Sequence, residues 1–465
     1  MSEGLPPPGA YAEYPDASPP LPAPERRASA LLDGPLRPAI LRLALPAVAT
    51  TLCQVLFNVV DMFWVGRTLG ARALAAVSIS SYSIWAMTSL GELIGVGLTA
   101  VAARRHGEGR PDAAARAAGT ALWMAAALGL VVAAGGIASL GAVLGLMRAP
   151  PELHDTARAF LAVQLAGAAL VYGYFVVAAS FRAAGDTRTP FYLLGGSVLL
   201  NLALDPAMIL GWGPLPAMGV YGAALATVLT RGLAFAVGIV LLARRGGIRP
   251  GFEPLVARTI VRVGTPTMLT GVLFSLIYMF LARVTGAFGG AALAAQGVGH
   301  KIEGVSYMIT IGFGLAAEAL VGQNLGAGQR ARAREAGWLT VRMTLWPTAA
   351  LGAVFLLAPE PLVRIFTDDP AVVSAAVLYL RAAAVAQLAI AFESVLESSL
   401  AGAGYTLWPA LWTTSLNLVR IPLAGWAAAR WGLEGIWWML SVTAIGRGVV
   451  MAAMWRWGRW EGRRV

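Results

Sequence analysis

Charged residues are scarce in this chain of 465 amino acids: they make up 13% of it, whereas apolar residues reach 58%. A soluble protein of this length needs more charge to cover its surface, so we expect lipid to be the solvent for most of the chain. Cysteine is scarce too. Cys53 is the single one, which excludes an intrachain disulfide and a cysteine-based metal site. The three histidines stand far apart, without the spacing of metal ligands.

Lysine occurs once, as Lys301 between His300 and Ile302. An ATP-driven pump requires a glycine-rich loop that ends in Gly-Lys-Ser or Gly-Lys-Thr, and this chain has none. We therefore expect no nucleotide and no cofactor, so active transport would have to use an ion gradient. The net charge of +11 rests on arginines. They cluster after every second apolar stretch, as in the cytoplasmic loops of membrane proteins. This pattern argues against nucleic acid as a partner and predicts both termini in the cytoplasm.

Long apolar runs, in contrast, are plentiful. A spanning helix takes about 20 apolar residues, and we expect about twelve such helices in an all-α membrane protein of the inner cell membrane. Their approximate ranges are 38–65, 74–103, 117–147, 157–181, 191–212, 219–243, 259–285, 291–322, 337–363, 372–401, 407–429 and 432–455. Residues 1–37 are rich in proline and predict a disordered cytoplasmic tail.

An internal repeat divides the spans into two sets. The segment Gly185-Asp-Thr-Arg-Thr-Pro190 recurs as Gly404-Tyr-Thr-Leu-Trp-Pro409, displaced by 219 residues (404 − 185 and 409 − 190). Since each copy has six helices, both copies run in the same direction, and a pseudo-two-fold axis along the membrane normal relates them. We predict an N-lobe (38–243), a cytoplasmic linker (244–258), a C-lobe (259–457) and a basic cytoplasmic C-terminus (458–465). Such a repeat is typical of transporters, although an ancient duplication without transport is the alternative.

Two acids stand inside expected spans, where a charge costs roughly 2.5–3.5 kcal/mol. Asp61 and Asp205 lie at similar depth, about five and seven residues before the outer ends of their helices. Asn201 precedes Asp205 by four residues and shares its helix face. Pro206 cannot donate to the carbonyl of Leu202, which leaves a further oxygen nearby. These oxygen ligands suit Na⁺ or coupled protons.

The competing interpretation is a structural one, in which a partner such as Arg231 neutralises the two acids. The repeat limits the cation site to the first half, because Ile421 stands opposite Asp205 in the second. Five further acids lie within expected spans: Glu92, Glu303, Glu318, Glu393 and Glu397. Three of them, Glu303, Glu393 and Glu397, could be secondary coupling residues or structural groups.

Four motifs together resemble those of the MATE (multidrug and toxic compound extrusion) transporters, over residues 36–457. They are Asn58-x-x-Asp61-x-x-x-Val65-Gly66, Arg182-x-x-Gly185-Asp-Thr-Arg-x-Pro190, Asn201-x-x-x-Asp205-Pro206 and Leu320-Val-Gly-Gln-Asn-Leu-Gly-Ala-Gly328. The resemblance implies two six-helix lobes around a V-shaped cleft. It also implies export of amphipathic, often cationic compounds in exchange for Na⁺ or H⁺.

The chain is most similar to the DinF-like branch, whose coupling site lies in the N-lobe. The matching positions are Asp61, Asn201 and Asp205, which could hold Na⁺, together with Thr227 in the sixth helix. The branch often has an asparagine late in the fourth helix, where this chain has Ala178. That departure shifts the expectation slightly from Na⁺ toward protons.

The sequence thus predicts a secondary multidrug antiporter that works by alternating access, acts on a drug or metabolite in the bilayer and functions as a monomer. It predicts no enzyme, since no span carries paired histidines, a Ser–His combination or a metal set. A lipid-linked precursor flippase is the main alternative, kept open by Arg231 and Arg420; a polytopic membrane enzyme is a weaker one. Five side chains could line a drug pocket or simply pack in the core: Trp85, Met87, Tyr172, Tyr174 and Met208.

Overall fold

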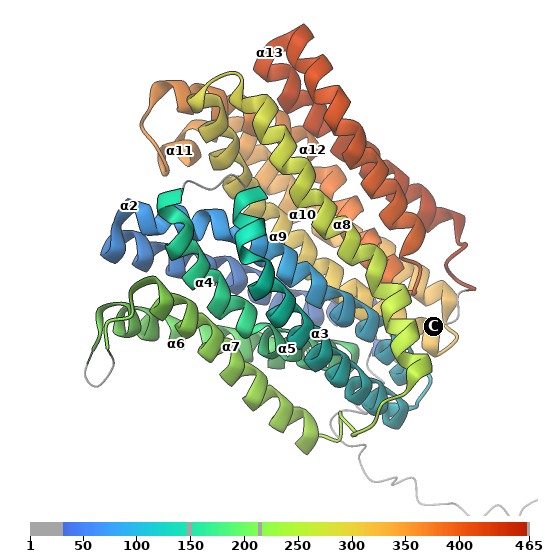
Figure 1. Ribbon diagram of the computed structural model, residues 1–465. Coiled ribbons are helices and arrows are strands. Elements are labelled where there is room, and N and C mark those ends of the chain that lie inside the picture. Colours follow the sequence, from blue (N-terminus) through green and yellow to red (C-terminus); the bar gives the residue numbers. More distant parts are fainter. Residues whose placement is uncertain (1–30, 147–150, 213–215, 463–465) are drawn as a thin grey trace, which may run out of the picture.

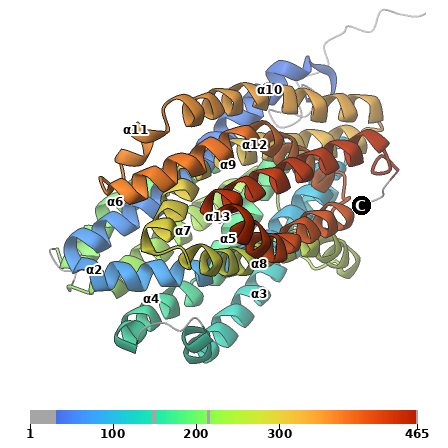
Figure 2. The same cartoon turned by 90° about the horizontal axis from the view of Figure 1, so that it is seen from above.

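The computed structural model describes residues 31–146, 151–212 and 216–462, and within these ranges every regular element is a helix. Figures 1 and 2 show them as one bundle. In chain order they are α2 (Leu36–Gly107), α3 (Pro111–Leu146), η1 (Pro151–Leu153), α4 (His154–Ala166), α5 (Ala168–Ala183), α6 (Arg188–Leu210), α7 (Gly219–Arg244), α8 (Pro254–Gly286), α9 (Gly290–Gly326), α10 (Arg330–Leu357), α11 (Pro359–Arg364), α12 (Pro370–Gly402) and α13 (Leu407–Trp457).

Ten helical stretches of the described chain are long and apolar enough to cross a membrane, or eleven when α4 and α5, bent by 46°, count as one span. In this count α2 already supplies two spans, because it breaks at Gly70, whose φ of 80° lies in the left-handed region. Helix α13 breaks in the same way at Gly432. Its 51 residues extend about 76 Å at 1.5 Å per residue, more than twice the roughly 30 Å of hydrocarbon. Counting α13 as two spans gives twelve, and the predicted all-α membrane fold is confirmed.

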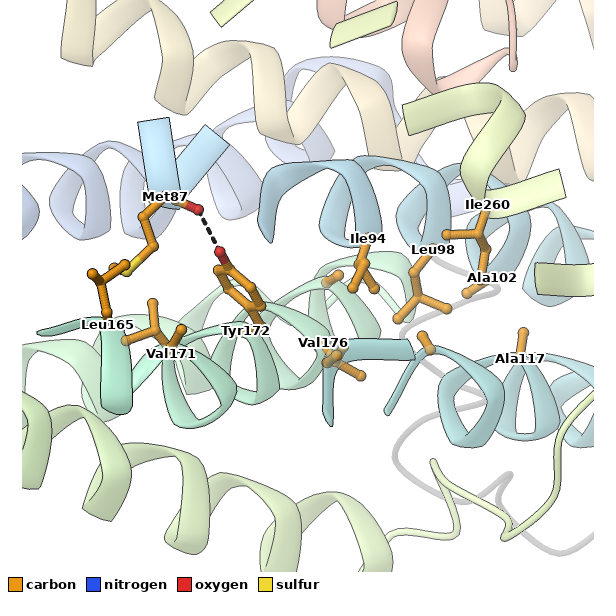
Figure 3. Packing of buried hydrophobic residues seen from close by; sticks show 14 of the residues in the cluster. Met87, Ile94, Leu98, Ala102, Ala117, Leu165, Val171, Tyr172, Val176 and Ile260 are labelled. Atoms are coloured by element: carbon orange, nitrogen blue, oxygen red, sulfur yellow. Dashed lines mark hydrogen bonds between the residues drawn. The ribbon is translucent and has the colours of Figure 1, made fainter. Parts of the chain in front are cut away.

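The two predicted lobes appear as two groups of helices. In Figure 1, helices α2–α7, coloured blue to green, lie mainly on one side of the bundle, and α8–α13, coloured yellow to red, lie mainly on the other. In the first group, side chains of α2, α3 and α5 form one apolar core, to which α8 adds Ile260 (Figure 3). In the second, α8, α9, α12 and α13 share another core.

The beginning of α2 does not stay within its own half. Leu36, Ile40 and Leu43 pack with Phe313 and Leu320 of α9 in a third core, which also includes residues of α10, α12 and α13. The first spanning helix therefore joins the two halves at one end of the molecule.

The end of the predicted tail is packed as well. Residues 1–30 lie outside the described residues, but Leu31 is only 2% exposed and belongs to the same core as Leu36. The guanidinium of Arg332 donates to the backbone oxygens of Leu31, at 3.3 Å, and of Gly34. The high proline content of residues 1–37 predicted disorder, and the packing of Leu31 was therefore not predicted. Similarly, α8 begins at Pro254, inside the range predicted as a linker.

The repeated Gly185–Pro190 segment builds a helix start. Asp186 accepts hydrogen bonds from the backbone N–H groups of Arg188 and Thr189, both at 3.1 Å, at the first turn of α6. Its other oxygen pairs with Arg245 at 2.8 Å, just after α7 ends. Gly185 supplies the positive φ of 80° that the turn needs. Asp186 therefore has a structural role, because it connects the start of α6 to the residue after the end of α7.

Candidate functional site

Three helices bring the predicted coupling residues together. Asp61 of α2 accepts a hydrogen bond from the Thr227 hydroxyl of α7 at 3.0 Å. On α6, the side-chain amide of Asn201 donates to Asp205 at 2.9 Å. Asp61 also lies close enough to Asp205 and Asn201 to interact with both electrostatically. All four side chains are at least nine-tenths buried. The structure thus places the four residues in one buried cluster, which we call the carboxylate cluster.

The carboxylate cluster contains more acceptors than donors. Within the described ranges, one side-chain oxygen each of Asp61, Asn201 and Asp205 is buried and has no hydrogen-bond partner. A buried acceptor without a donor costs roughly 1–3 kcal/mol, and two ionised carboxylates in contact also repel each other. A proton or a small monovalent cation relieves both costs at once. Carboxylate and amide oxygens are the ligands that hard cations prefer, so the residues present fit Na⁺ as well as H⁺.

The composition of the carboxylate cluster differs from that of a typical protein site for a transition metal. Over the described part of the chain, no three His, Cys, Asp or Glu side chains are grouped so that they could hold a metal ion.

Arg231 does not lock the two acids in a salt bridge. In the described structure it forms no ion pair within 4.0 Å of Asp61 or Asp205. Its guanidinium carbon lies 4.8 Å from the ring centroid of Phe57 instead, and only 9% of the residue is exposed. The structural alternative, in which Arg231 permanently neutralises the acids by direct pairing, does not describe this conformation.

The secondary acids belong to the second half, and two of them have partners there. Glu303 accepts a hydrogen bond from the hydroxyl of Tyr379 at 2.6 Å. Glu393 forms a buried ion pair with Arg447 at 2.9 Å. Glu397 makes no hydrogen bond or ion pair with any described residue. Because Glu303 and Glu393 already have partners, both have a structural role in this conformation.

Four of the five residues considered for a drug pocket are core residues. Tyr172 is fully buried, and its hydroxyl donates to the backbone oxygen of Met87 at 2.7 Å (Figure 3). Tyr174 and Met208 are 4% and 3% exposed. Only Trp85, at 44%, offers a large accessible surface. Apolar periodicity alone does not distinguish these positions, since every face of a spanning helix is apolar.

Residues that join the two halves escaped the sequence analysis. The side-chain amide of Gln323 on α9 donates to the backbone oxygen of Ala183 on α5 at 2.6 Å. The Thr51 hydroxyl of α2 donates to the backbone oxygen of Met308 on α9 at 2.8 Å. Gly326 lies so close to α2 that an added Cβ would overlap the carbonyl oxygen of Arg104. These two positions could have been noticed in the sequence, because Gln323 and Ala183 both lie in motifs that support the family resemblance. We call this set of contacts the seam.

Comparison with known proteins agrees with the repeat. The MatE family model matches residues 46–207 and 266–426, one segment in each half. The chain belongs to the MatE family. It is 30% identical over 443 residues to the probable multidrug resistance protein NorM of Thermotoga maritima, covering 92% of this chain and 94% of that protein. It is 32% identical over 431 residues to the probable NorM protein of Pseudomonas putida (87% and 90% covered).

Solved structures show the same fold. An outward-facing multidrug resistance MATE family transporter superposes with a TM-score of 0.87 at 23% identity, covering 94% of this chain and 99% of that one. The Vibrio cholerae MATE transporter VcmN in its bent form gives 0.83 at 21% identity, with 93% and 98% covered. At these identities the likeness shows the two-lobe fold alone. Members of the MatE family are transporters, so this chain is a multi-pass membrane transporter and not an enzyme.

Proposed function

We propose that the protein is a secondary active multidrug exporter, which antiports amphipathic, often cationic compounds against H⁺ or Na⁺. The observation that carries the proposal is the carboxylate cluster, in which Asp61 and Asp205 meet from separate helices at membrane depth. The names of the NorM relatives support the substrate class. The DinF-like branch stays a prediction, since it rests on the motif residues alone.

The proposed cycle is alternating access between the two halves. Cation binding at Asp61 and Asp205 favours one arrangement of the halves and drug binding favours the other, since a ligand that is indifferent to the state shifts nothing. For an uncharged substrate, one cation moving inward through 100 mV supplies about 2.3 kcal/mol, enough for a substrate gradient of about fifty-fold. For a monovalent cationic substrate exchanged one for one, only the concentration gradient of the coupling cation drives export.

The orientation of the chain is part of the proposal. The seam contacts of Gln323 and Gly326 lie at the end where α2 and α9 finish, beside Arg104 and Arg105. If this arginine-rich end is cytoplasmic, as the charge pattern predicts, the conformation described is closed toward the cytoplasm. Both termini then lie in the cytoplasm, and the membrane is the bacterial inner membrane.

Transport by the purified full-length protein in proteoliposomes tests the proposal. Efflux of a fluorescent organic cation is measured under an imposed pH gradient and, separately, under an imposed sodium gradient. We expect one gradient to drive efflux by wild type and neither to drive it in Asp61→Asn. The matched control is Asp368→Asn, which neutralises a carboxylate whose side chain is 93% exposed. Equal, gradient-independent efflux by wild type and by empty liposomes would rule the function out.

The flippase alternative depends on arginines that are free to bind a pyrophosphate. Arg420 is 1% exposed and donates to Thr443 at 2.8 Å, to Tyr278 at 3.2 Å and to the backbone oxygen of Leu440 at 3.2 Å, all in its own half. These bonds occupy the guanidinium, which disfavours a flippase. Transport of an anionic compound should be tested as well, because one relative is named as an FAD transporter. This protein of Shewanella oneidensis is 26% identical over 352 residues, with 74% of this chain and 77% of that protein covered.

A further inference from the structure

Arg231 is placed beside the carboxylate cluster by a regular pairing of two helices. On α2, Phe57 and Asp61 are four residues apart and share a face; on α7, Thr227 and Arg231 do the same. Thr227 donates to Asp61 at 3.0 Å, and one turn along, Arg231 lies over Phe57 at 4.8 Å. The Cα atoms of Thr227 and Arg231 are about 6 Å apart along α7, at 1.5 Å per residue, and the guanidinium lies over Phe57, one turn from Asp61 on α2.

Nothing else in the surroundings balances the charge of this arginine. Among the described groups that act on Asp61, Arg231 is the one basic side chain. Its Nε is buried and makes no hydrogen bond to the described residues. Tyr174 of α5 faces it, but this phenol is uncharged and donates to the backbone oxygen of Pro190 at 3.3 Å. The charge that Arg231 balances is therefore that of the carboxylate cluster.

The charges can be counted. Asp61 and Asp205 contribute −2 when ionised, and Arg231 contributes +1, because a guanidinium stays protonated in proteins. The sum is −1. One proton or one Na⁺ brings the buried site to zero, whereas a second would leave a net positive charge in a low-dielectric environment, which is strongly unfavourable. Without the arginine, the same two carboxylates would need two cations to reach neutrality.

We propose that Arg231 is a built-in countercharge, which limits the carboxylate cluster to one monovalent cation in each transport cycle. The inference rests on the proposed function, because it concerns the same site. It assigns Arg231 a role in setting the coupling ratio: the residue acts through the charge balance and not by touching the cation. The guanidinium lies over the ring of Phe57 instead of in a direct ion pair, which would compete with the cation.

The coupling ratio can be measured at a thermodynamic reversal point. Proteoliposomes carry the full-length protein, the membrane potential is held at zero with potassium and valinomycin, and ethidium is the transported probe. The driving cation is whichever one powers wild-type efflux. At zero potential, the substrate ratio at which net flux reverses equals the cation ratio raised to the number of cations exchanged. A tenfold cation gradient therefore balances a substrate gradient of about tenfold for one cation and about a hundredfold for two.

We expect about tenfold for wild type and for Arg231→Lys, which keeps the charge, and a value that rises toward a hundredfold for Arg231→Met. A merely structural role for Arg231 would change the rate of transport but not this ratio. The matched control is Arg420→Gln, which removes a buried arginine from the other half and should leave the ratio of the remaining transport near tenfold.

Each result supports or contradicts the inference. A wild-type ratio near a hundredfold, or an Arg231→Met ratio that stays near tenfold, overturns it. If Arg231→Met folds but does not transport, calorimetry counts the cations bound by the detergent-solubilised protein: two for each protein supports the inference and one contradicts it. If this variant does not fold, Arg231→Gln, which also removes the charge, is measured in its place. Wild-type efflux that follows neither gradient instead refutes the proposed function, so the two failures are distinguishable.

Discussion

Replacing Gln323 by leucine removes one hydrogen bond that crosses the seam. In the conformation described, the Gln323 amide is fully buried and donates to the backbone oxygen of Ala183 at 2.6 Å. If the halves separate at this end during transport, water satisfies both groups in the open state. The substitution then weakens the closed state and leaves the open state almost unchanged.

The size of the shift follows from the geometry. Losing a hydrogen bond of this kind costs about 1 kcal/mol net, and leaving the buried Ala183 oxygen without a donor raises the cost toward 3 kcal/mol. The amide oxygen of Gln323 has no partner among the described residues, so its removal relieves a buried unsatisfied acceptor and offsets part of the loss. Leucine also recovers part of the loss by burying apolar surface. We therefore expect the lower end of this range, about a five- to tenfold shift in population toward the open state.

Cysteine labelling measures this population. Because Cys53 is the single cysteine, Cys53→Ser gives a cysteine-free background. Ala103→Cys then reports on the seam, since Ala103 is fully buried and faces Gly322 of the other half. The rate of maleimide labelling at position 103 should rise about five- to tenfold in Gln323→Leu, in proportion to the open population.

The control is Gln387→Leu. Gln387 is also fully buried, but its hydrogen bonds to Ser306 and to the backbone oxygen of Ala383 stay within the second half. This variant should lower the melting temperature without accelerating labelling at position 103. An unchanged or slower labelling rate in Gln323→Leu, or equal acceleration by Gln387→Leu, would refute the idea that the seam separates as a unit.

Three further substitutions test local roles. Tyr172→Phe removes the bond to the Met87 backbone and should lower the unfolding free energy by about 1 kcal/mol without changing substrate affinity; an affinity change without loss of stability would return Tyr172 to the substrate site. Asp186→Ala removes a helix cap and should cost about 1–2 kcal/mol in denaturation experiments, whereas no loss would contradict the capping role. Gly326→Ala should accelerate labelling at the seam, because the new methyl group overlaps the opposing backbone, whereas Gly304→Ala on the same helix meets open space and should not.

The fold was predictable because its signals are local or periodic. Apolar run lengths define the spans, and the 219-residue displacement between Gly185 and Gly404 defines the two halves. Asn201 and Asp205 were predicted to share a face from their spacing of four, and their hydrogen bond has that geometry. The predicted gaps between spans, 66–73 and 430–431, fall at or beside the two helix breaks. Because glycine is frequent throughout the chain, the backbone angles were needed to identify Gly70 and Gly432 as the break residues.

Contacts between distant segments were not predictable from the residues alone. Thr227 and Asp61 are 166 residues apart, and Gln323 and Ala183 are 140 apart. Thr227 was found only through the family resemblance. No periodicity separates a side chain that faces lipid from one that faces another helix, so Tyr172 was considered a lining residue although it is fully buried.

The two halves descend from one repeat but treat their buried charges differently. In the second half, Glu393 is paired with Arg447, and Arg420 makes hydrogen bonds to three oxygens. In the first half, the carboxylate cluster keeps buried oxygens without donors, and Arg231 stands near Asp61 without pairing directly. An unsatisfied buried group lowers stability, so its retention needs another reason, and function is the usual one. Because a cation can satisfy these oxygens and then leave, the first half has a site whose charge can alternate. In the second half, the paired Glu393 and the hydrogen-bonded Arg420 have their partners within that half, so we expect them to move with it as one body.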